Sequence, residues 1–480
     1  MLKSVMTVAA GLLLIALSAQ NENDALRYSR IGFGGSARYS AMAGAFGALG
    51  GDMSVMTTNP AGLGFYRKNE LVFTPSVYNQ KVSSVYNQTN TADVRTNFRF
   101  DNFGFVFGGR TENKEEDGWQ YVTMGIAYNR YNTFQANLLM SGQSETSMMD
   151  AWKKTASGTA IQDLNQFYEG LAYNAWLLNP APGINQYSDT IPEGDLLKQT
   201  KSTTLRGGMG EWSFGIGANY SHKLYVGASV GISQIRYEEA STYSEQEVID
   251  TISKFEYYEF NESIETKGRG INLKVGVIYR PVDAVRFGFA FHTPTAYRLS
   301  DTWQTSLTSY IDNVVYNPIS PVGNYQYTIR TPMRLTGSAG FVFGKVAVLD
   351  VDYEFVDYTN AMLRSADYSY IDENNAIQTK YTAAHNIRSG IEIRMLPYSL
   401  RGGFAYYGSP YKESVNNDAV RTYITGGVGY RDPNDDFYVD FAIVKSAQKE
   451  NYFFYDQSLV NPVRNNWSGM NILLTVGFRY

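Results

Sequence analysis

The segment Trp212–Ser221 reads WSFGIGANYS and alternates between large apolar or aromatic residues and small or polar ones. The large set comprises Trp212, Phe214, Ile216, Ala218 and Tyr220. A period of two places successive side chains on opposite faces of an extended strand, so one face of this strand is apolar. The other face carries Gly, Ser and Asn, which suits a polar lumen with lipid outside.

The same alternation recurs along the chain and predicts fourteen strands. They lie near 70–79, 94–110, 119–133, 211–221, 223–240, 254–280, 285–297, 327–343, 346–358, 383–395, 399–408, 421–431, 436–447 and 469–480. The connections alternate between short turns and long segments, of which 134–210 is the longest, and 80–93 is intermediate. An even strand number with short turns at one end and long loops at the other is typical of outer-membrane barrels. The final residue, Tyr480, resembles the aromatic end of the barrel-assembly signal. We therefore predict an all-β fold, a transmembrane antiparallel β-barrel.

The composition favours the same class. The 480 residues include 38 Tyr and 44 Gly, and only 18% are charged, below the roughly 25% of ordinary soluble domains. The net charge of −5 argues against nucleic acid as a partner, because phosphate binding needs a basic face. The absence of Cys excludes disulfides and thiolate metal sites. A secreted tyrosine-rich β protein is the alternative.

Residues 1–19 have the layout of a secretory signal peptide. Lys3 supplies a positive charge, an apolar core runs from Val5 to Leu17, and small residues follow. We expect cleavage after Ser18 or Ala19, so this segment does not count towards the fold.

The segment Gly35–Phe65 is rich in Gly and Ala and contains the turn motif NPAG at 59–62. Small residues allow close packing in a confined space, and Asn-Pro followed by Gly fixes a turn. Its motifs are GSAR at 35–38, MAGAF at 42–46, GD at 51–52 and NPAGL at 59–63. These motifs resemble the N-terminal hatch of the FadL/TodX-type outer-membrane transporters, while over the rest of the chain the resemblance is architectural.

The resemblance implies a fourteen-stranded barrel over 67–480 with residues 20–66 folded inside the lumen as a hatch. It implies passive uptake of hydrophobic small molecules such as long-chain fatty acids across the bacterial outer membrane. The expected hatch and gating residues are Arg38, Asp52, Asn59, Pro60, Ala61 and Gly62. In the family the substrate leaves sideways through a kinked wall strand, which here corresponds to Trp119–Tyr131 with Gly125 as its possible weak point.

The expected partners are a hydrophobic small-molecule ligand, outer-membrane lipid and, during biogenesis, the barrel-assembly machinery. Two other functions stay open at this stage. One is a barrel that binds protein partners in secretion or surface assembly, and the other is a structural or weakly conducting barrel.

The long connection 134–210 is expected to be a partly helical loop over the barrel mouth. Apolar residues recur there at helical spacing, namely Ile161, Leu164, Tyr168, Leu171, Ala175 and Leu178. Thr159 is placed to cap such a helix and Pro180 to end it. The stripe suits a landing site for an apolar solute, and packing against other loops is an equal alternative.

The expected substrate-binding residues combine this loop with cations on the lumen face. They are Trp152, Leu164, Phe167, Leu171, Trp176, Lys274 and Arg334. Lys274 and Arg334, like Arg286, are placed to meet a substrate carboxylate, and the alternative is that they are solvated lumen charges.

An enzymatic function is not expected. The match to G-x-S-x-G at 227–231 lies inside an alternating strand, whereas a nucleophile elbow needs a strand–turn–helix context. The three histidines, His222, His292 and His385, lie on separate elements. We predict no catalytic residue, no metal site and no cofactor.

Overall fold

The computed structural model describes residues 21–480, apart from 113–116, 250–254, 416 and 418. The predicted signal peptide and its cleavage sites lie outside the described residues. The long barrel strands are β1 (Glu70–Tyr86), β2 (Thr89–Arg110), β3 (Trp119–Thr133), β7 (Leu197–Tyr220), β8 (Leu224–Glu247), β9 (Phe255–Val282), β15 (Ala347–Asp357), β17 (Ala383–Met395), β18 (Tyr398–Tyr407), β19 (Arg421–Arg431), β20 (Phe437–Tyr452) and β21 (Val463–Arg479). The remaining strands are β4 (Ala136–Ser144), β5 (Leu178–Ala181), β6 (Gln186–Asp189), β10 (Val285–His292), β11 (Ala296–Ile311), β12 (Val314–Tyr316), β13 (Gly323–Arg330), β14 (Arg334–Phe343) and β16 (Met362–Arg364).

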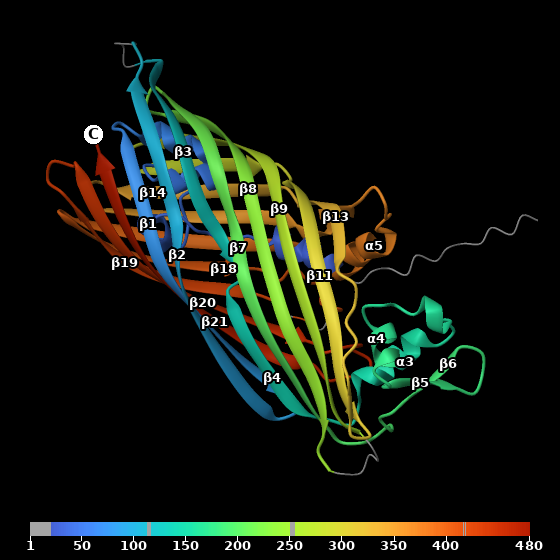
Figure 1. Cartoon of the computed structure of the whole chain (residues 1–480). Coiled ribbons are helices and arrows are strands. Elements are labelled where there is room, and N and C mark those ends of the chain that lie inside the picture. The colour runs from blue at the N-terminus through green and yellow to red at the C-terminus, as the bar shows by residue number, and fades with distance from the viewer. Residues whose placement is uncertain (1–20, 113–116, 250–254, 416, 418) are drawn as a thin grey trace, which may run out of the picture.

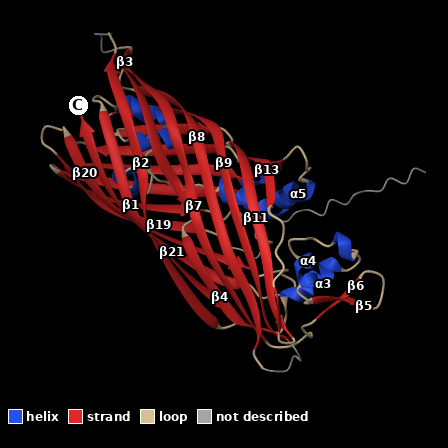
Figure 2. Ribbon diagram, viewed as in Figure 1, coloured by secondary structure: helices blue, strands red, loops and turns tan. Residues whose placement is uncertain are grey.

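These strands form one closed antiparallel barrel of fourteen wall positions, as predicted (Figures 1 and 2). Closure comes from β1, which pairs with β2 on one side and with the last strand, β21, on the other. Three wall positions are each built from two consecutive strands, β3 with β4, β10 with β11, and β13 with β14. The strands β10, β11, β13 and β14 share the ladder of their neighbours, so the wall remains continuous at those two positions.

The predicted apolar faces point outward. Phe214 and Ile216 on β7 are 47% and 44% exposed, whereas the preceding Ser213 on the other face is fully buried. Along β8 the outward residues are apolar up to Ile232 and, apart from Ala240, polar from Gln234 onwards. The apolar belt therefore covers only the part of the wall near the short turns, and the strands continue beyond it.

Several strands are longer at the long-loop end than the alternation predicts. The connection expected at 80–93 is strand except for a two-residue turn, Asn87-Gln88, in which both residues have positive φ. Much of 134–210 and 241–253 likewise belongs to β4, β7 and β8. The apolar alternation stops where the outward residues become polar, so it marks only the apolar belt.

The N-terminal segment fills the lumen as a hatch of four short helices (Figure 2). These are α1 (Glu22–Ser29), α2 (Ala37–Ala41), η1 (Met53–Thr57) and η2 (Pro60–Phe65). At the long-loop end α1 contacts α5 (Ile371–Lys380), and Lys380 Nζ lies 2.6 Å from Glu22 Oε1. At the other end η2 packs against β7, β8 and β9 and leads directly into β1. The hatch thus runs along the lumen between the two ends of the barrel.

The large loop forms a small subdomain at the long-loop end (Figure 1). It contains α3 (Met148–Ala156), η3 (Ile161–Asp163), α4 (Glu169–Asn174) and the hairpin of β5 and β6. A further short helix, η4 (Tyr358–Asn360), precedes β16. In the part of the chain that the structure describes, no helix has the length and apolarity to cross a bilayer.

The predicted single helix over 161–178 is wrong in detail. The apolar stripe is divided between η3 and α4, Thr159 caps neither helix, and Pro180 lies in β5. Leu171 and Leu178 nevertheless point into the same buried cluster as Trp152. The spacing therefore predicts burial correctly for Leu164, Leu171, Ala175 and Leu178, which separate short segments contribute to one core, whereas Ile161 is 45% exposed.

Candidate functional site

An ion-pair network fixes the hatch to the wall. Arg38 Nε donates to Glu392 Oε2 at 2.8 Å, and Arg401 Nε donates to the same oxygen at 2.7 Å. Arg394 Nε donates to the other oxygen of Glu392 at 2.8 Å. Burial alone would lower the pKa of Arg38, but the Glu392 carboxylate raises that pKa above its usual range. The Arg38 cation is therefore firmly held on β17.

The other predicted hatch residues organise the hatch itself. Asp52 caps η1 and accepts a hydrogen bond from Ser36 Oγ at 2.5 Å, so it pairs within the hatch. Asn59 caps η2 through Ala61 N–H, and its Nδ2 donates to the carbonyls of Gly47 at 2.6 Å and Val277 at 3.3 Å. The Asn59–Pro60 turn therefore joins two parts of the hatch to β9.

Close backbone approach explains the small residues around this turn. A Cβ built at Gly62 would lie 2.9 Å from Val55 Cγ2, and one built at wall residue Gly227 would lie 2.3 Å from the Pro60 carbonyl oxygen. Real Cβ atoms do not come this close to other atoms, so glycine is favoured inside the hatch at Gly62 and on the wall at Gly227. The predicted tight packing of the hatch is present here.

Two wall carboxylates hold the central hatch loop and were not predicted. Asp352 on β15 accepts the backbone N–H groups of Phe46 at 3.3 Å and Gly47 at 3.1 Å. Asp350 accepts the N–H of Ala48 at 3.1 Å. Both aspartates are fully buried. They act as anionic caps for a loop that has no helix of its own.

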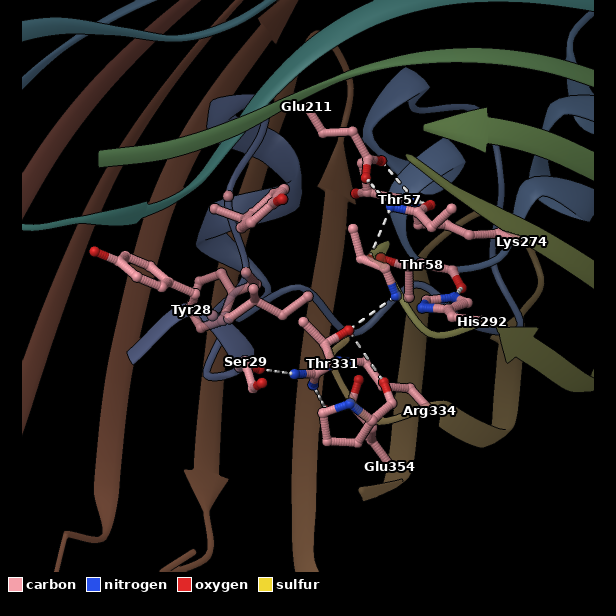
Figure 3. Close-up of a pocket in the computed structure, with 18 of the residues that line it drawn as sticks. Tyr28, Ser29, Thr57, Thr58, Glu211, Lys274, His292, Thr331, Arg334 and Glu354 are labelled. Atoms are coloured by element: carbon pink, nitrogen blue, oxygen red, sulfur yellow. Dashed lines mark hydrogen bonds and ion pairs between the residues drawn. The ribbon is translucent and has the colours of Figure 1, made fainter. Parts of the chain in front are cut away.

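A buried polar cluster lies between the hatch and the wall, around a cavity of ≈ 50 Å³ (Figure 3). Lys274 Nζ donates to Glu211 Oε1 at 2.5 Å, and Arg334 Nη1 donates to Glu354 Oε1 at 3.0 Å. His292 Nε2 lies 2.7 Å from the carbonyl oxygen of Thr58 in the hatch. Lys274 and Arg334 thus already have carboxylate partners, and a substrate carboxylate would have to displace them.

The larger cavity, of ≈ 390 Å³, lies between the hatch and the wall sector from β19 through β1 to β8. Phe33 of the hatch lines it, together with residues 130–136 at the junction of β3 and β4. We call this space the lumen cavity. Of these two cavities, the lumen cavity is the one large enough for a small organic ligand.

Beside the lumen cavity the wall ladder is interrupted. β3 pairs with β2 only over 102–110 of β2, and β4 continues paired to β7 alone. Among the described residues, no backbone pairing joins 89–101 of β2 to β4. We call this stretch the seam.

Side chains bridge the seam in place of a backbone ladder. Arg95 donates to Gln135 Oε1 at 3.1 Å and to Asn137 Oδ1 at 3.0 Å. Thr91 Oγ1 donates to the carbonyl of Leu139, and Asn87 Nδ2 donates to that of Gln143 at 2.7 Å.

Gly125, the possible weak point in β3, lies in regular pairing with Val106 and Gly215. The register of β3 with β7 shifts instead at the two ends of the strand, between Trp119 and Tyr121 and between Arg130 and Asn132. The interruption in the wall is therefore close to the predicted strand end but not at the predicted glycine.

The predicted ligand residues of the loop lie apart from Lys274 and Arg334. Trp152, Leu164 and Leu171 are buried in the core of the loop subdomain. Phe167 contacts Trp303 of β11 with ring centroids 5.4 Å apart, and Trp176 is 57% exposed. The structure therefore separates a loop group at the mouth from the cation group inside the lumen.

Solved structures with the same architecture include a FadL homologue and two toluene transporters. A Pseudomonas aeruginosa FadL homologue is 12% identical with a TM-score of 0.53, covering 93% of this chain and 99% of its own. The Ralstonia pickettii toluene transporter TbuX is 14% identical with a TM-score of 0.50 and the same coverage. The Pseudomonas putida toluene transporter TodX is 13% identical, also with a TM-score of 0.50 and the same coverage.

The chain has the fold of the FadL-type transporters. No protein-family model matches the sequence, and no curated protein matches it. At these identities the likeness concerns the fold, and function has to be argued from the hatch, the lumen cavity and the seam.

Proposed function

We propose that this protein mediates passive uptake of hydrophobic small molecules across the bacterial outer membrane, with the hatch as its gate. The observation that carries the proposal is the position of the lumen cavity, between the hatch and the seam. A ligand in this cavity has protein on the hatch side and a wall without a backbone ladder on the other. The transport activities in the names of the structural neighbours support the same function.

The route begins at the long-loop end, which we assign to the cell surface. Aromatic side chains of the loop subdomain and its neighbours offer a first contact there. The ring centroids of Trp176 and Tyr316 lie 6.2 Å apart, and the ring of Phe167 contacts that of Trp303. The ligand then reaches the lumen cavity and leaves through the seam into lipid. Long-chain fatty acids remain candidate ligands, with the loop residues as their landing site.

Gating requires the hatch to move, and a disulfide lock tests this requirement. The chain has no cysteine. A Cβ built at Gly340 on β14 lies 3.2 Å from Ala48 Cβ, close to the roughly 3.5–4.5 Å that a disulfide needs. The double variant Ala48→Cys/Gly340→Cys therefore joins the hatch to the wall after a small adjustment.

In proteoliposomes the oxidised double variant should take up labelled fatty acid or toluene at least about tenfold more slowly than after reduction. The single variants Ala48→Cys and Gly340→Cys serve as controls and should not respond to reductant. Equal rates in the oxidised and reduced states would exclude gating by this part of the hatch.

A protein-binding role is the second candidate, and exposed apolar side chains on the loop subdomain favour it. Ile184 at the tip of the β5–β6 hairpin is 89% exposed and Trp176 is 57% exposed. A partner that co-purifies in stoichiometric amount, and is lost on substitution Ile184→Ser, would support this function over uptake.

A further inference from the structure

The lining of the lumen cavity is more polar than a purely apolar ligand requires. Charged side chains from the hatch and from five strands face it, namely Arg27, Arg99, Asp101, Arg130, Glu239, Arg421 and Glu450. Amide and hydroxyl side chains lie between them, including Gln80, Gln135, Gln448, Ser446 and Asn471. A polar group on the ligand would find partners here, whereas a hydrocarbon would leave them unpaired.

Three of the four arginines on this lining already hold a carboxylate. Arg27 forms an ion pair with Asp24, and Arg99 Nε lies 2.9 Å from Asp101 Oδ1. Arg130 Nε lies 3.9 Å from the same Asp101 oxygen. These cations are balanced within the protein.

Arg421 is different. Its Nε donates to the neutral Gln448 Oε1 at 2.5 Å, and within the described ranges no carboxylate lies at ion-pair distance from it. The nearest acid along this chain of contacts is Glu450, which accepts from Gln448 Nε2 at 3.3 Å. The Arg421 guanidinium thus lines the cavity with donors that a ligand anion can use.

A second guanidinium adds to the positive potential around Arg421. Arg30, at the end of α1, is buried and donates from Nη2 to the carbonyl of Ala419 at 2.6 Å. Burial first, and then the charge of Arg421, lower the pKa of Arg30 to about 10. Two cations therefore act on each other across the hatch and β19, which favours an anion beside them.

The other end of the cavity is apolar. Ala136, Leu138 and Met140 of β4 line it together with Leu205 of β7. Aromatic rings lie along the lining between the two ends, namely Phe33, Tyr78, Phe134, Tyr423, Tyr452 and Trp467. The cavity is therefore amphipathic, with a cationic side at β19 and an aliphatic side at β4.

We propose that the lumen cavity binds a compact aromatic carboxylate, with its acid group on Arg421 and its ring towards β4. This inference rests on the proposed uptake function and narrows its substrate class. The volume of ≈ 390 Å³ lies near the lower end of the roughly 300–1,000 Å³ of ligand pockets, which suits a compact ligand. The aromatic lining supplies ring contacts, and the guanidinium supplies a bidentate site for a carboxylate.

Three ligands with one ring system separate the contributions of charge, polarity and apolar area: 2-naphthoate, 2-naphthamide and naphthalene. Binding is measured by equilibrium dialysis on the full chain in lipid nanodiscs, with empty nanodiscs as the blank and palmitate as an aliphatic comparison. The wild type should bind naphthoate roughly tenfold more tightly than naphthamide, because charge-assisted hydrogen bonds are the stronger ones.

The variant Arg421→Gln should lose this preference, while its affinity for naphthamide stays within about twofold. Arg421→Lys should keep part of the preference for naphthoate, because lysine retains the positive charge but lacks the planar guanidinium that binds a carboxylate through two hydrogen bonds. The matched control is Arg431→Gln on the same strand, whose cation pairs with Asp435 at 3.5 Å and does not line the cavity. Its preference should equal that of the wild type.

The outcomes distinguish this inference from the proposed function. Loss of the preference in Arg421→Gln alone supports the inference. Binding of naphthalene or palmitate as tight as that of naphthoate, unchanged in Arg421→Gln, overturns the substrate class and leaves hydrophobic uptake standing. If none of the four ligands binds above the blank, the proposed uptake function fails and the inference fails with it.

Discussion

The wall at β7–β9 and the wall at the seam differ in how their neighbouring strands are joined. Between β7 and β8 the register runs without interruption from Leu197 opposite Glu247 to Tyr220 opposite Leu224. At the seam β2 and β4 are joined by side chains such as Arg95. Backbone groups in a bilayer need partners, and a ladder supplies all of them at once. Side-chain bridges can be broken singly, so the seam is the part of the wall suited to opening.

The hatch lies between these two walls and is held on both sides. Away from the seam its anchors are on β9, β15 and β17, through Asn59, Asp350, Asp352 and Arg38. Beside the seam, the Gly32 N–H donates to the Tyr131 carbonyl at 3.1 Å, and Asn132 Nδ2 donates to the Arg30 carbonyl at 3.1 Å. The lumen cavity occupies the side towards the seam. A hatch movement that keeps these anchors would change the cavity first, and one that breaks them would open the lumen.

The largest effect is expected from breaking the strongest anchor. Glu392→Ala leaves Arg38, Arg394 and Arg401 without their shared carboxylate, and loss of one partner from a buried network costs roughly 3–5 kcal/mol. The hatch should be released more often, which planar-bilayer recordings would register as increased conductance. The matched control is Asp436→Ala, which removes only an exposed pair with Lys68 at 3.8 Å.

This prediction separates the anchored side of the hatch from the side towards the seam. If Glu392→Ala conducts no more than Asp436→Ala, the ion-pair network does not hold the hatch in place. The contacts of η2 with β7 and β8 would then be what holds the hatch in place.

Sequence reasoning predicted the regular wall well and the seam poorly. The strand that contains Phe214 and Ile216 can be predicted from its alternating apolar residues, because each outward position faces lipid. Beyond Ile232 the outward positions of β8 face polar surroundings, so the pattern ends although the strand continues. The seam depends on which distant strands pair, and a local period of two carries no information about pairing.

The sequence allows some, but not all, of the anchors of the hatch to be predicted. Arg38 was predicted to need a partner in the lumen, but Glu392 was not identified. A signal was present, because Glu392 lies between Ile391 and Ile393 on the lumen face of an alternating strand. Asp350 and Asp352 have the same pattern between Leu349, Val351 and Tyr353. An acidic residue at a lumen-facing position, between apolar residues that face lipid, indicates that its carboxylate has a buried hydrogen-bond or ion-pair partner.

An intermediate effect is expected from pH at the long-loop end of the hatch. Burial raises the pKa of Asp24 in α1 to about 6; Asp301 of β11 and Glu239 of β8 add to this, while Arg27 and the Asn21 N–H oppose it. Because the docked pKa exceeds the undocked value near 3.9, docking of α1 is strongest below pH 4 and weakens as pH rises through 6. The full change is roughly 2–3 kcal/mol.

Protection of the amides of α1 from hydrogen exchange would measure this docking. Protection should be greater at pH 5 than at pH 7.5, after correction for the intrinsic exchange rate. Asp24→Asn removes the titrating group and should give equal protection at both values. A wild type whose corrected protection does not change between pH 5 and pH 7.5 would contradict the prediction.

The smallest effect on stability, and the most direct test of the seam, is expected from Arg95→Ala. It removes two hydrogen bonds to neutral amides, each with a net contribution of about 0.5–1.5 kcal/mol. The barrel should unfold at nearly the same temperature, because the ladders of β1 and β2 remain. Uptake of an apolar solute should rise about two- to fivefold, since opening the seam breaks fewer bonds.

Arg236→Ala on β8 is the matched control, because this arginine pairs with Glu238 on the outer surface of a continuous ladder. It should change neither uptake nor amide exchange. In Arg95→Ala, exchange should accelerate in 89–101 of β2 and stay unchanged in β8. Equal acceleration in both strands would mean that the seam and the ladder open together, and the difference between the two walls would then have no functional meaning.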